Sequence, residues 1–190
     1  MLTTVKHLSI SEMEAQLDDL RNSPKKEGKI ELIVRRPAIG QREVLQTGEL
    51  DTTQGLIGDN WSTRGSSRTP DGTAHPEMQI NIMNARVIKL IATEKQYWPL
   101  AGDQFYVELD FITENLPPGT RLGLGSAILE VTSIPHNGCK KFAERFGLDA
   151  VKFVNSPVGK ELHFRGINAK VVKSGIVNSG DMIRRLETVS

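Results

Sequence analysis

The chain contains one cysteine, Cys139, in the stretch SIPHNGCKKFAERFG at residues 133–147. The Pro-His-Asn-Gly segment before it is typical of a turn, and CKKFAERFG has the spacing of a short helix that ends at a glycine. The thiol is therefore expected at a helix start, where partial positive charge favours an anion. Lys140 and Lys141 add cationic charge, and His136 is placed to hydrogen-bond the sulfur or to move its proton. These effects favour the nucleophilic thiolate. The competing interpretation is a small buried apolar side chain.

Arginines elsewhere in the chain are candidate ligands for an anion. Arg64 and Arg68 lie in the Gly/Ser-rich segment STRGSSRTP, which could close over a phosphate, and the alternative is a solvated surface loop. Arg165 stands at the start of a predicted strand, in HFRGIN. Arg35 and Arg36 are adjacent in another predicted strand, so they face opposite sides and at most one of them faces a cleft.

The common metal and nucleophile motifs do not fit this sequence. His136 and Cys139 have His-x-x-Cys spacing, but no second cysteine pair or HExxH segment accompanies them, so structural zinc is not expected. A Cys-His hydrolase is disfavoured because its histidine would lie only three residues from the cysteine. Neither a GxSxG segment nor a P-loop is present. His75 precedes a proline at a strand entrance and is a candidate cofactor ligand, with an ordinary loop histidine as the alternative.

Length, charge and cysteine content indicate one globular domain in a reducing compartment. A chain of 190 residues can bury a sizeable core without disulfides. A lone cysteine forms no internal disulfide, which is usual where thiols stay reduced. The net charge of +1 provides no global field for nucleic acid or membrane. No apolar run has the length of a signal peptide or a membrane span. We therefore expect a cytoplasmic protein with no nucleic-acid or membrane partner.

The N-terminal part differs in pattern from the rest of the chain. Residues 1–27 are predicted to form a helical appendage, with Ser11 as N-cap and Glu14 at the capping-box position. Beyond it, short alternating apolar runs separated by Gly, Pro and Asn-Ser-Gly turns predict about seven strands and three or four short helices, as in a barrel or sandwich. The segment 52–77 is predicted to be a loop, and loops of that length are often functional.

Several segments, taken in order, resemble the MOSC family, the molybdenum cofactor sulfurase C-terminal domains. GLIGDNW resembles the family's Gly-x-x-Gly-Asp-x-Trp segment, HPEMQINIMNARVI its following strand and helix, and GKELHFRGINAKVVKSGIVNSGDMI its closing segment. The stretch LPPGTRLGLGSAILEVTSIPHNGCKKFAERFG resembles the central motif. The matching positions of that motif and of the Gly-Asp and Asn-Leu pairs before it are Gly102, Asp103, Asn115, Leu116, Pro118 to Leu122, Gly125 and Cys139.

The resemblance covers roughly residues 29–185 and implies the fold of that segment. It implies a mainly β, α+β architecture, a closed β-barrel of the MOSC or pyruvate kinase-barrel-like type, here with an N-terminal helix. It also implies binding of the molybdenum cofactor, a phosphorylated pterin (molybdopterin), in a cleft. Larger sulfurases of the family carry a pyridoxal-phosphate domain that takes sulfur from free cysteine, and 190 residues leave no room for such a domain.

Three functions are compatible with this resemblance. In the first, Cys139 is a persulfide sulfur carrier or a metal ligand, tuned by His136 and Lys140, while Lys141, Arg165, Arg64, Arg68 and His75 hold the anionic cofactor. Its partners would be a molybdenum-pterin or other sulfur acceptor and a sulfur-donating desulfurase or a molybdoenzyme. In the second, the protein reduces N-hydroxylated compounds with molybdenum, as some stand-alone relatives are associated with. In the third, it is a non-enzymatic adaptor that hands on the cofactor.

Overall fold

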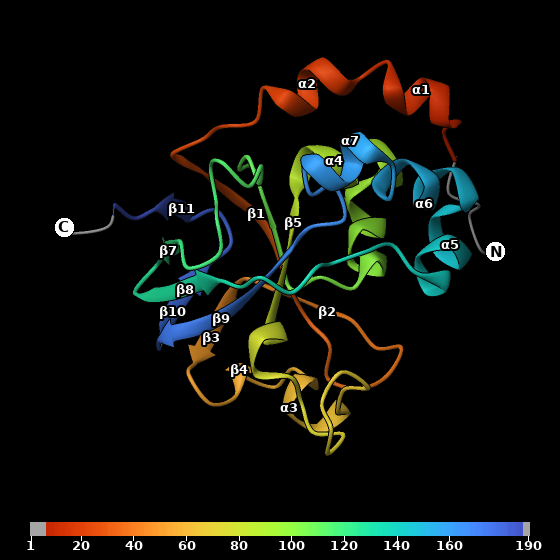
Figure 1. Cartoon of the computed structure of the whole chain (residues 1–190). Coiled ribbons are helices and arrows are strands. Elements are labelled where there is room, and N and C mark those ends of the chain that lie inside the picture. Colours follow the sequence, from red (N-terminus) through yellow and green to blue (C-terminus); the bar gives the residue numbers. More distant parts are fainter. Residues whose placement is uncertain (1–6, 188–190) are drawn as a thin grey trace.

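A closed β-barrel of seven strands forms the centre of the protein in a computed structural model that describes residues 7–187 (Figure 1). The strand order around the barrel is β11-β7-β8-β9-β5-β6-β1, and β1 pairs with β11 to close it. Only β5 and β6 run parallel among these neighbours, so the barrel is mixed. Its strands are β1 (Glu27–Arg35), β5 (Ile80–Asn84), β6 (Phe105–Val107), β7 (Arg121–Leu124), β8 (Ala127–Val131), β9 (Ile167–Lys173) and β11 (Met182–Arg185). The closed barrel that the sequence implied is confirmed.

Strand β1 closes the barrel because its two halves pair with different neighbours. Its first residues pair with β11, and its later residues pair with β6 on one edge and with β2 (Glu43–Leu45) on the other. The register against β6 shifts between Ile30 and Leu32. Gly28 permits the close approach at this irregularity, since a Cβ there would lie 1.5 Å from the Glu108 carbonyl oxygen.

Two apolar cores follow from the alternation of side chains along the barrel strands. One fills the barrel and contains residues such as Ile33, Phe105 and Leu129, all fully buried. The other lies between the outside of the barrel and a layer of helices, and includes Tyr106 and Phe153. Because neighbouring residues of β6 supply both cores, this strand separates them.

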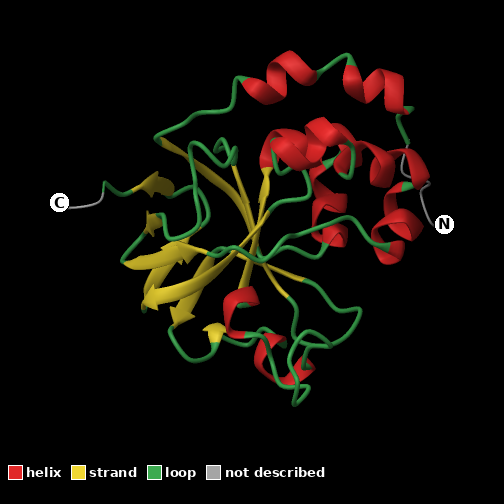
Figure 2. Ribbon diagram, in the orientation of Figure 1, coloured by secondary structure: helices red, strands yellow, loops and turns green. Residues whose placement is uncertain are grey.

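Most helices gather along one side of the barrel, whereas α3 and the short 3₁₀ helix η1 lie apart from them (Figure 2). Helices α1 and α2 cross the top of this layer in the view shown. No helix in the described residues is long and apolar enough to cross a membrane. The bounds are α1 (Ile10–Glu14), α2 (Leu17–Arg21), α3 (Trp61–Arg64), α4 (Ala85–Ala92), α5 (Lys140–Phe146), α6 (Leu148–Val154), α7 (Pro157–Glu161), and the 3₁₀ helices η1 (Pro76–Met78) and η2 (Lys95–Ala101).

The predicted helix start near the N-terminus was two residues out of place. Ser9, not Ser11, is the N-cap of α1, and its side chain exchanges hydrogen bonds with Glu12 in a capping box. Ser9 and Ser11 both have an acidic residue three positions later, so the spacing alone did not distinguish them. Residues 1–6 of the predicted appendage lie outside the described residues.

A small second sheet and a short helix occupy the predicted long loop and its surroundings. The sheet has the order β10-β3-β4, with β10 (Gly175–Asn178), β3 (Thr47–Asp51) and β4 (Gly55–Leu56). The segment 52–77 thus contains β4, α3 and the start of η1, and is not a structureless loop. Between residues 7 and 187 the chain has eleven strands and seven α-helices, more and shorter pieces than predicted.

Candidate functional site

Side chains donate hydrogen bonds to five consecutive carbonyl groups in the segment 98–102, which ends η2. Four of the five donors are arginines from distant parts of the chain, so this short segment gathers guanidinium groups around itself. The donors to the successive carbonyl oxygens of Trp98, Pro99, Leu100, Ala101 and Gly102 are Tyr106, Arg42, Arg145, Arg165 and Arg36. Arg42 and Arg145 come together beside Gly102, where a Cβ would lie 3.5 Å from one guanidinium and 3.8 Å from the other.

Arg36 and Asp59 form a buried ion pair in which all of the carboxylate's capacity is used. Asp59 Oδ1 accepts from the backbone N–H and Nε of Arg36, each at 2.8 Å, and Oδ2 accepts from Nη2 at 2.7 Å. Oδ2 also accepts from the backbone N–H of Trp61 at 3.0 Å. Such bidentate, charge-assisted pairing is the strongest kind of protein hydrogen bond. Arg35 instead points outward to Glu43, so the two adjacent arginines face opposite sides, as strand alternation predicted.

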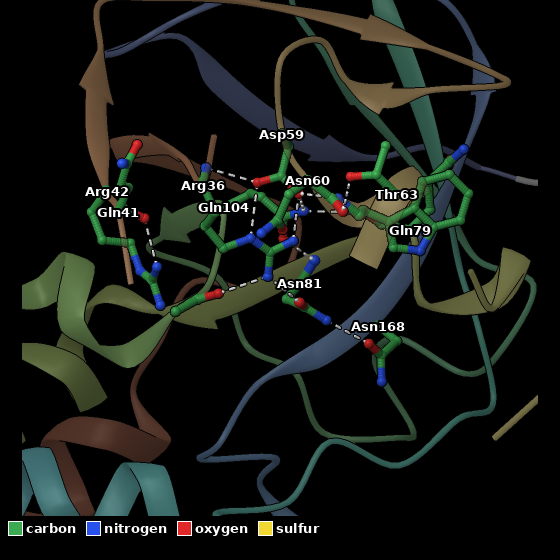
Figure 3. A network of polar contacts seen from close by, with 12 residues as sticks. Arg36, Gln41, Arg42, Asp59, Asn60, Thr63, Gln79, Asn81, Gln104 and Asn168 are labelled. Carbon is green, nitrogen blue, oxygen red and sulfur yellow. Dashed lines mark hydrogen bonds and ion pairs between the residues drawn. The ribbon is translucent and has the colours of Figure 1, made fainter. Parts of the chain in front are cut away.

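A chain of buried amides joins this ion pair to the loop that carries the cysteine (Figure 3). Arg36 Nη1 donates to Asn81 Oδ1 at 3.0 Å, and Asn81 Nδ2 donates to Asn168 Oδ1 at 2.6 Å. Asn168 Nδ2 in turn donates to the carbonyl oxygen of Ile134 at 2.9 Å. The network therefore fixes the start of the segment 132–139, which we call the cysteine loop, relative to the barrel strands.

A second buried pair, Arg165 with Asp103, leaves several polar atoms without partners. Arg165 Nη1 donates to Asp103 Oδ2 at 2.7 Å. The other carboxylate oxygen, Asp103 Oδ1, lies 3.6 Å from Nδ1 of His136, beyond good hydrogen-bonding distance. Asp103 Oδ1, His136 Nδ1 and Arg165 Nε are all buried and have no hydrogen-bond partner among the described residues. We call these three atoms the unpaired trio.

Burial and surrounding charge shift the pKa values in this region. Burial raises the pKa of the Asp103 carboxyl, although the Arg165 guanidinium opposes the shift. Burial and the positive charges of Arg165, Arg36, Arg68 and Arg64 hold the pKa of His136 well below its usual value. His136 is therefore neutral at physiological pH, and its contact with Asp103 is not an ion pair.

The six arginines near these aspartates carry more charge than the aspartates neutralise. Asp59 and Asp103 each pair with one arginine. The other four have no carboxylate within 4 Å in the part of the chain that the structure describes. Burial and neighbouring guanidinium groups lower the pKa of Arg42 and Arg64, as expected where like charges lie close together.

We call Arg36, Arg42, Arg64, Arg68, Arg145 and Arg165 the arginine cluster. An anion is the ligand that this surplus charge favours.

Four predicted site residues meet in one region of the structure. The charges of Arg64, Arg68 and Arg165 all lower the pKa of His136, so these three predicted residues share an electrostatic environment with the predicted histidine. Arg165 also stacks over the ring of Phe142 in α5, with its Cζ 4.9 Å from the ring centroid. Their roles as cofactor ligands stay predictions.

Cys139 lies at the edge of this region. It is exposed and is the N-cap residue of α5, as the sequence predicted, and its carbonyl accepts from the N–H groups of Phe142 and Ala143 at 3.0 Å each. Cys139 follows His136 by three residues. Phe142, whose ring packs against the Arg165 guanidinium, lies one helical turn after Cys139. Lys140 and Lys141 are exposed on the same turn. The thiol is thus open to solvent and not a buried apolar group.

His75 makes hydrogen bonds within its own loop region. Its Nδ1 accepts from the backbone N–H of Glu77 at 3.2 Å, which caps η1, and its carbonyl accepts from Trp61 Nε1 at 3.2 Å. These contacts agree with the loop-histidine alternative. Within residues 7–187, no group of three or more His, Cys, Asp or Glu side chains is arranged to hold a metal ion.

The sequence reasoning missed several members of the site. Asp103 was noted only as part of the Gly-Asp pair in the family resemblance, and Arg42, Arg145, Asn81 and Asn168 were not singled out. One available signal was the polar Gly-Asp-Gln triplet directly before the apolar strand FYV, because polar residues at the entrance of a buried strand need partners.

Comparison with known proteins supports the fold alone. No family profile and no curated protein matches the chain. Among solved structures, the YuaD protein from Bacillus subtilis is 19% identical with a TM-score of 0.63, covering 85% of this chain and 97% of that one. YiiM from Escherichia coli is 16% identical with a TM-score of 0.55, covering 85% and 71%. YiiM from Geobacillus stearothermophilus is 13% identical with a TM-score of 0.54, covering 84% and 75%. The barrel with its short helices is thus similar to that of YuaD and YiiM.

Proposed function

We propose that this chain is a stand-alone MOSC-domain protein that binds a phosphorylated molybdenum-pterin cofactor and uses Cys139 as a sulfur carrier or as a ligand to the metal. The observation that carries the proposal is the arginine cluster beside the cysteine loop. Two of its arginines neutralise buried aspartates and four have no ion-pair partner in the described residues, so the surplus charge fits a phosphate-bearing ligand.

Two buried polar atoms without hydrogen-bond partners among the described residues also support the binding of a cofactor. Arg165 Nε is a buried N–H without a partner, and Asp103 Oδ1 is a buried acceptor without one. Unpaired buried groups cost about 1–3 kcal/mol each, and a ligand with both donor and acceptor atoms, such as a pterin, would offset that cost. Arg64 and Arg68 would hold the phosphate, and the exposed Cys139 would face the metal or its sulfur ligand. When bound, the cofactor would supply oxygen- or sulfur-atom transfer at molybdenum.

In the carrier form of the proposal, Cys139 takes up one sulfur atom. Its thiolate attacks the outer sulfur of a donor persulfide, the donor's S–S bond breaks, and the donor leaves as a thiolate. The new Cys139 persulfide ionises more readily than a thiol, and the neighbouring Lys140 and Lys141 would stabilise its charge. In this form of the proposal a separate desulfurase would be the donor. The acceptor would be the cofactor or a molybdoenzyme that receives it.

Intact mass and metal content of freshly purified protein test this proposal. A mass increase of about 32 Da that is lost in Cys139→Ser indicates a persulfide carrier. Molybdenum near one equivalent, reduced in Cys139→Ser, indicates a metal ligand. Arg64→Gln combined with Arg68→Gln should lower the bound molybdenum, whereas Arg184→Gln should not, because Arg184 is exposed and pairs with Glu27 at the barrel closure.

Other outcomes of the same measurements assign the protein differently. Molybdenum that Cys139→Ser retains, with an unmodified thiol in the wild-type protein, would favour the adaptor. Bound molybdenum together with reduction of N-hydroxylated compounds that Cys139→Ala abolishes would favour the reductase. Neither added sulfur nor molybdenum, after expression in cells that make the cofactor, would overturn the proposal.

A further inference from the structure

A cavity of about 450 Å³ lies against the cysteine loop, which contributes residues 132–137 to its wall. It is lined by residues of the cysteine loop, of α7 with the turn that follows it, and of the segment 113–118. Its volume falls in the range of about 300–1,000 Å³ that is usual for small-molecule sites. We call it the histidine cavity, because both His136 and His163 line it.

The wall of the histidine cavity is mainly apolar. Leu116, Val131, Ile134, Val154 and Ile167 contribute to it, and they present a surface against which a ring or a short hydrocarbon chain can pack. Leu116, Val131, Val154 and Ile167 are buried, so this part of the wall is fixed by the cores of the protein.

Lys160 of α7 is the charged side chain in the cavity wall. Among the described residues that line the cavity, no other has a formal charge at neutral pH, and none is Asp or Glu. Lys160 has no carboxylate within 4 Å among the described residues. Beyond the lining residues, the arginines that lower the pKa of His136 act together with Asp103, whose Oδ1 lies 3.6 Å from His136 Nδ1, and the charge of Glu114 acts on His163. A ligand with a single negative charge can therefore pair with Lys160 without meeting a carboxylate among the described residues that line the cavity.

The two histidines supply neutral polar contacts. Burial lowers the pKa of both imidazoles, so neither adds a charge of its own at neutral pH. His163 Nε2 lies 3.0 Å from Thr113 Oγ1 across the cavity mouth, and His163 has the rare positive φ of 50° for a residue other than glycine. His136 Nδ1 is buried without a partner, and Gly166 lies beside it with no side chain to cover it. A Cβ at Gly166 would lie 2.3 Å from the Ile82 carbonyl oxygen, so only glycine allows this close approach to β5.

We propose that the histidine cavity binds a small organic monocarboxylate, with its apolar part on the aliphatic wall and its carboxylate at Lys160. The size of the cavity, its aliphatic wall and its single unpaired cation carry this assignment. The cavity shares His136 with the region proposed above for the molybdenum-pterin cofactor, but the assignment of its ligand does not depend on that cofactor.

Benzoate, benzamide and benzamidinium test the assignment, because they share one ring and differ in charge. Titrations of each into protein with ¹⁵N-labelled histidine, followed by imidazole NMR, report binding at His136 and His163 directly. We expect benzoate to shift both histidines with the highest affinity, benzamide to bind more weakly, and benzamidinium to cause no saturable shift. Equal affinities for the three, or shifts at neither histidine, would overturn the proposal.

Two matched pairs of variants locate the ligand. Lys160→Gln should weaken benzoate about fivefold and leave benzamide unchanged, whereas Lys173→Gln, on the exposed end of β9, should change neither. Thr113→Trp, at an exposed position on the cavity rim, should block all binding, whereas Thr53→Trp in the exposed β3–β4 turn should not. Unchanged benzoate affinity in both Lys160→Gln and Thr113→Trp would exclude this cavity as its site.

The result is distinguishable from the test of the proposed function. Benzoate binding is read at the histidines of protein free of molybdenum, so absence of the cofactor does not affect it. Conversely, loss of benzoate binding in Thr113→Trp with unchanged molybdenum content would show that the two sites are independent.

Discussion

The two buried arginine–aspartate pairs of this protein have the same chemistry but different surroundings. Asp59 accepts four hydrogen bonds at 3.0 Å or less, three of them from Arg36. Asp103 accepts one from Arg165, and its other oxygen has no partner. Buried polar groups in native proteins are nearly always paired, and exceptions often mark functional sites. The comparison therefore assigns a structural role to the first pair and a ligand-facing role to the second.

The largest effect is expected from breaking the pair with Asp59. Asp59→Asn leaves the guanidinium of Arg36 buried without a counter-charge, and the side chains of both residues are almost fully buried. Removing one partner of such a pair costs about 3–5 kcal/mol. Urea denaturation should show this loss in the free energy of unfolding. A loss below about 1 kcal/mol would mean that the pair does not hold the barrel and the segment 98–102 together.

A smaller effect is expected from Asp103→Asn. Burial already disfavours the charged carboxylate of Asp103 more than Arg165 favours it, as the raised pKa indicates. The asparagine can keep its carbonyl oxygen on Arg165 and place its NH₂ group where the unpaired Oδ1 lies, whereas an asparagine at position 59 would turn its NH₂ group toward N–H donors. We therefore expect a loss of about 1–2 kcal/mol for Asp103→Asn in the same urea experiment. The binding of the cofactor or of an anion should fall more than stability does. If Asp103→Asn costs as much stability as Asp59→Asn, the distinction between the two pairs is wrong.

The fold was largely predictable from the sequence because its signals are local. Alternating apolar residues and glycine-containing turns indicated a barrel or a sandwich, and the family-like segments in their order chose the barrel. The cap at Ser9 was misplaced because two serines in succession satisfy the same local rule. The short helices between residues 140 and 161 were undercounted, since a single glycine separates α5 from α6.

The site was only partly predictable because its contacts are remote in sequence. Cys139 and His136 were found from their neighbours, and Arg165 from its position at a strand start. Asp103, the partner of Arg165, is 62 residues away from it in the sequence. Asn81 and Asn168, which hydrogen-bond to each other, are 87 residues apart. Nothing in the sequence near Asp103 states which arginine it will meet. Only the closure of the barrel brings these residues together.

The pH dependence of stability gives an intermediate test of the second pair. The folded-state pKa of His136 is lowered, so below an unfolded-state pKa of about 6.5 the unfolded chain binds a proton that the folded protein does not. This stabilisation is present above that pH and is lost as the pH falls. Between pH 7 and pH 5.5 we expect His136 to account for a loss of about 1 kcal/mol.

Urea denaturation of the wild type and His136→Gln at several pH values measures this contribution. The variant should lose less stability between pH 7 and pH 5.5 than the wild type. His163 has the same sign of shift and remains in both proteins, so it does not affect the difference. Asp103 has the opposite sign, because its raised pKa favours the folded state as the pH falls. Parallel curves for the two proteins would mean that the pKa of His136 is the same in the folded and unfolded states and is not lowered by burial.

The smallest effect is expected from Arg35→Gln. Together with a substitution of the adjacent Arg36, this variant compares an exposed ion pair with a buried one. Arg35 donates to Glu43 from Nε at 2.9 Å, but the side chains of both residues are partly exposed, at 33% and 46%. Water screens such a pair, and its removal costs at most about 1 kcal/mol. Arg36→Met, next to it, should cost several times more in urea denaturation, because it leaves Asp59 buried and unpaired. Equal losses for the two variants would show that burial does not set the strength of these pairs, and the contrast between the buried aspartates would then need another cause.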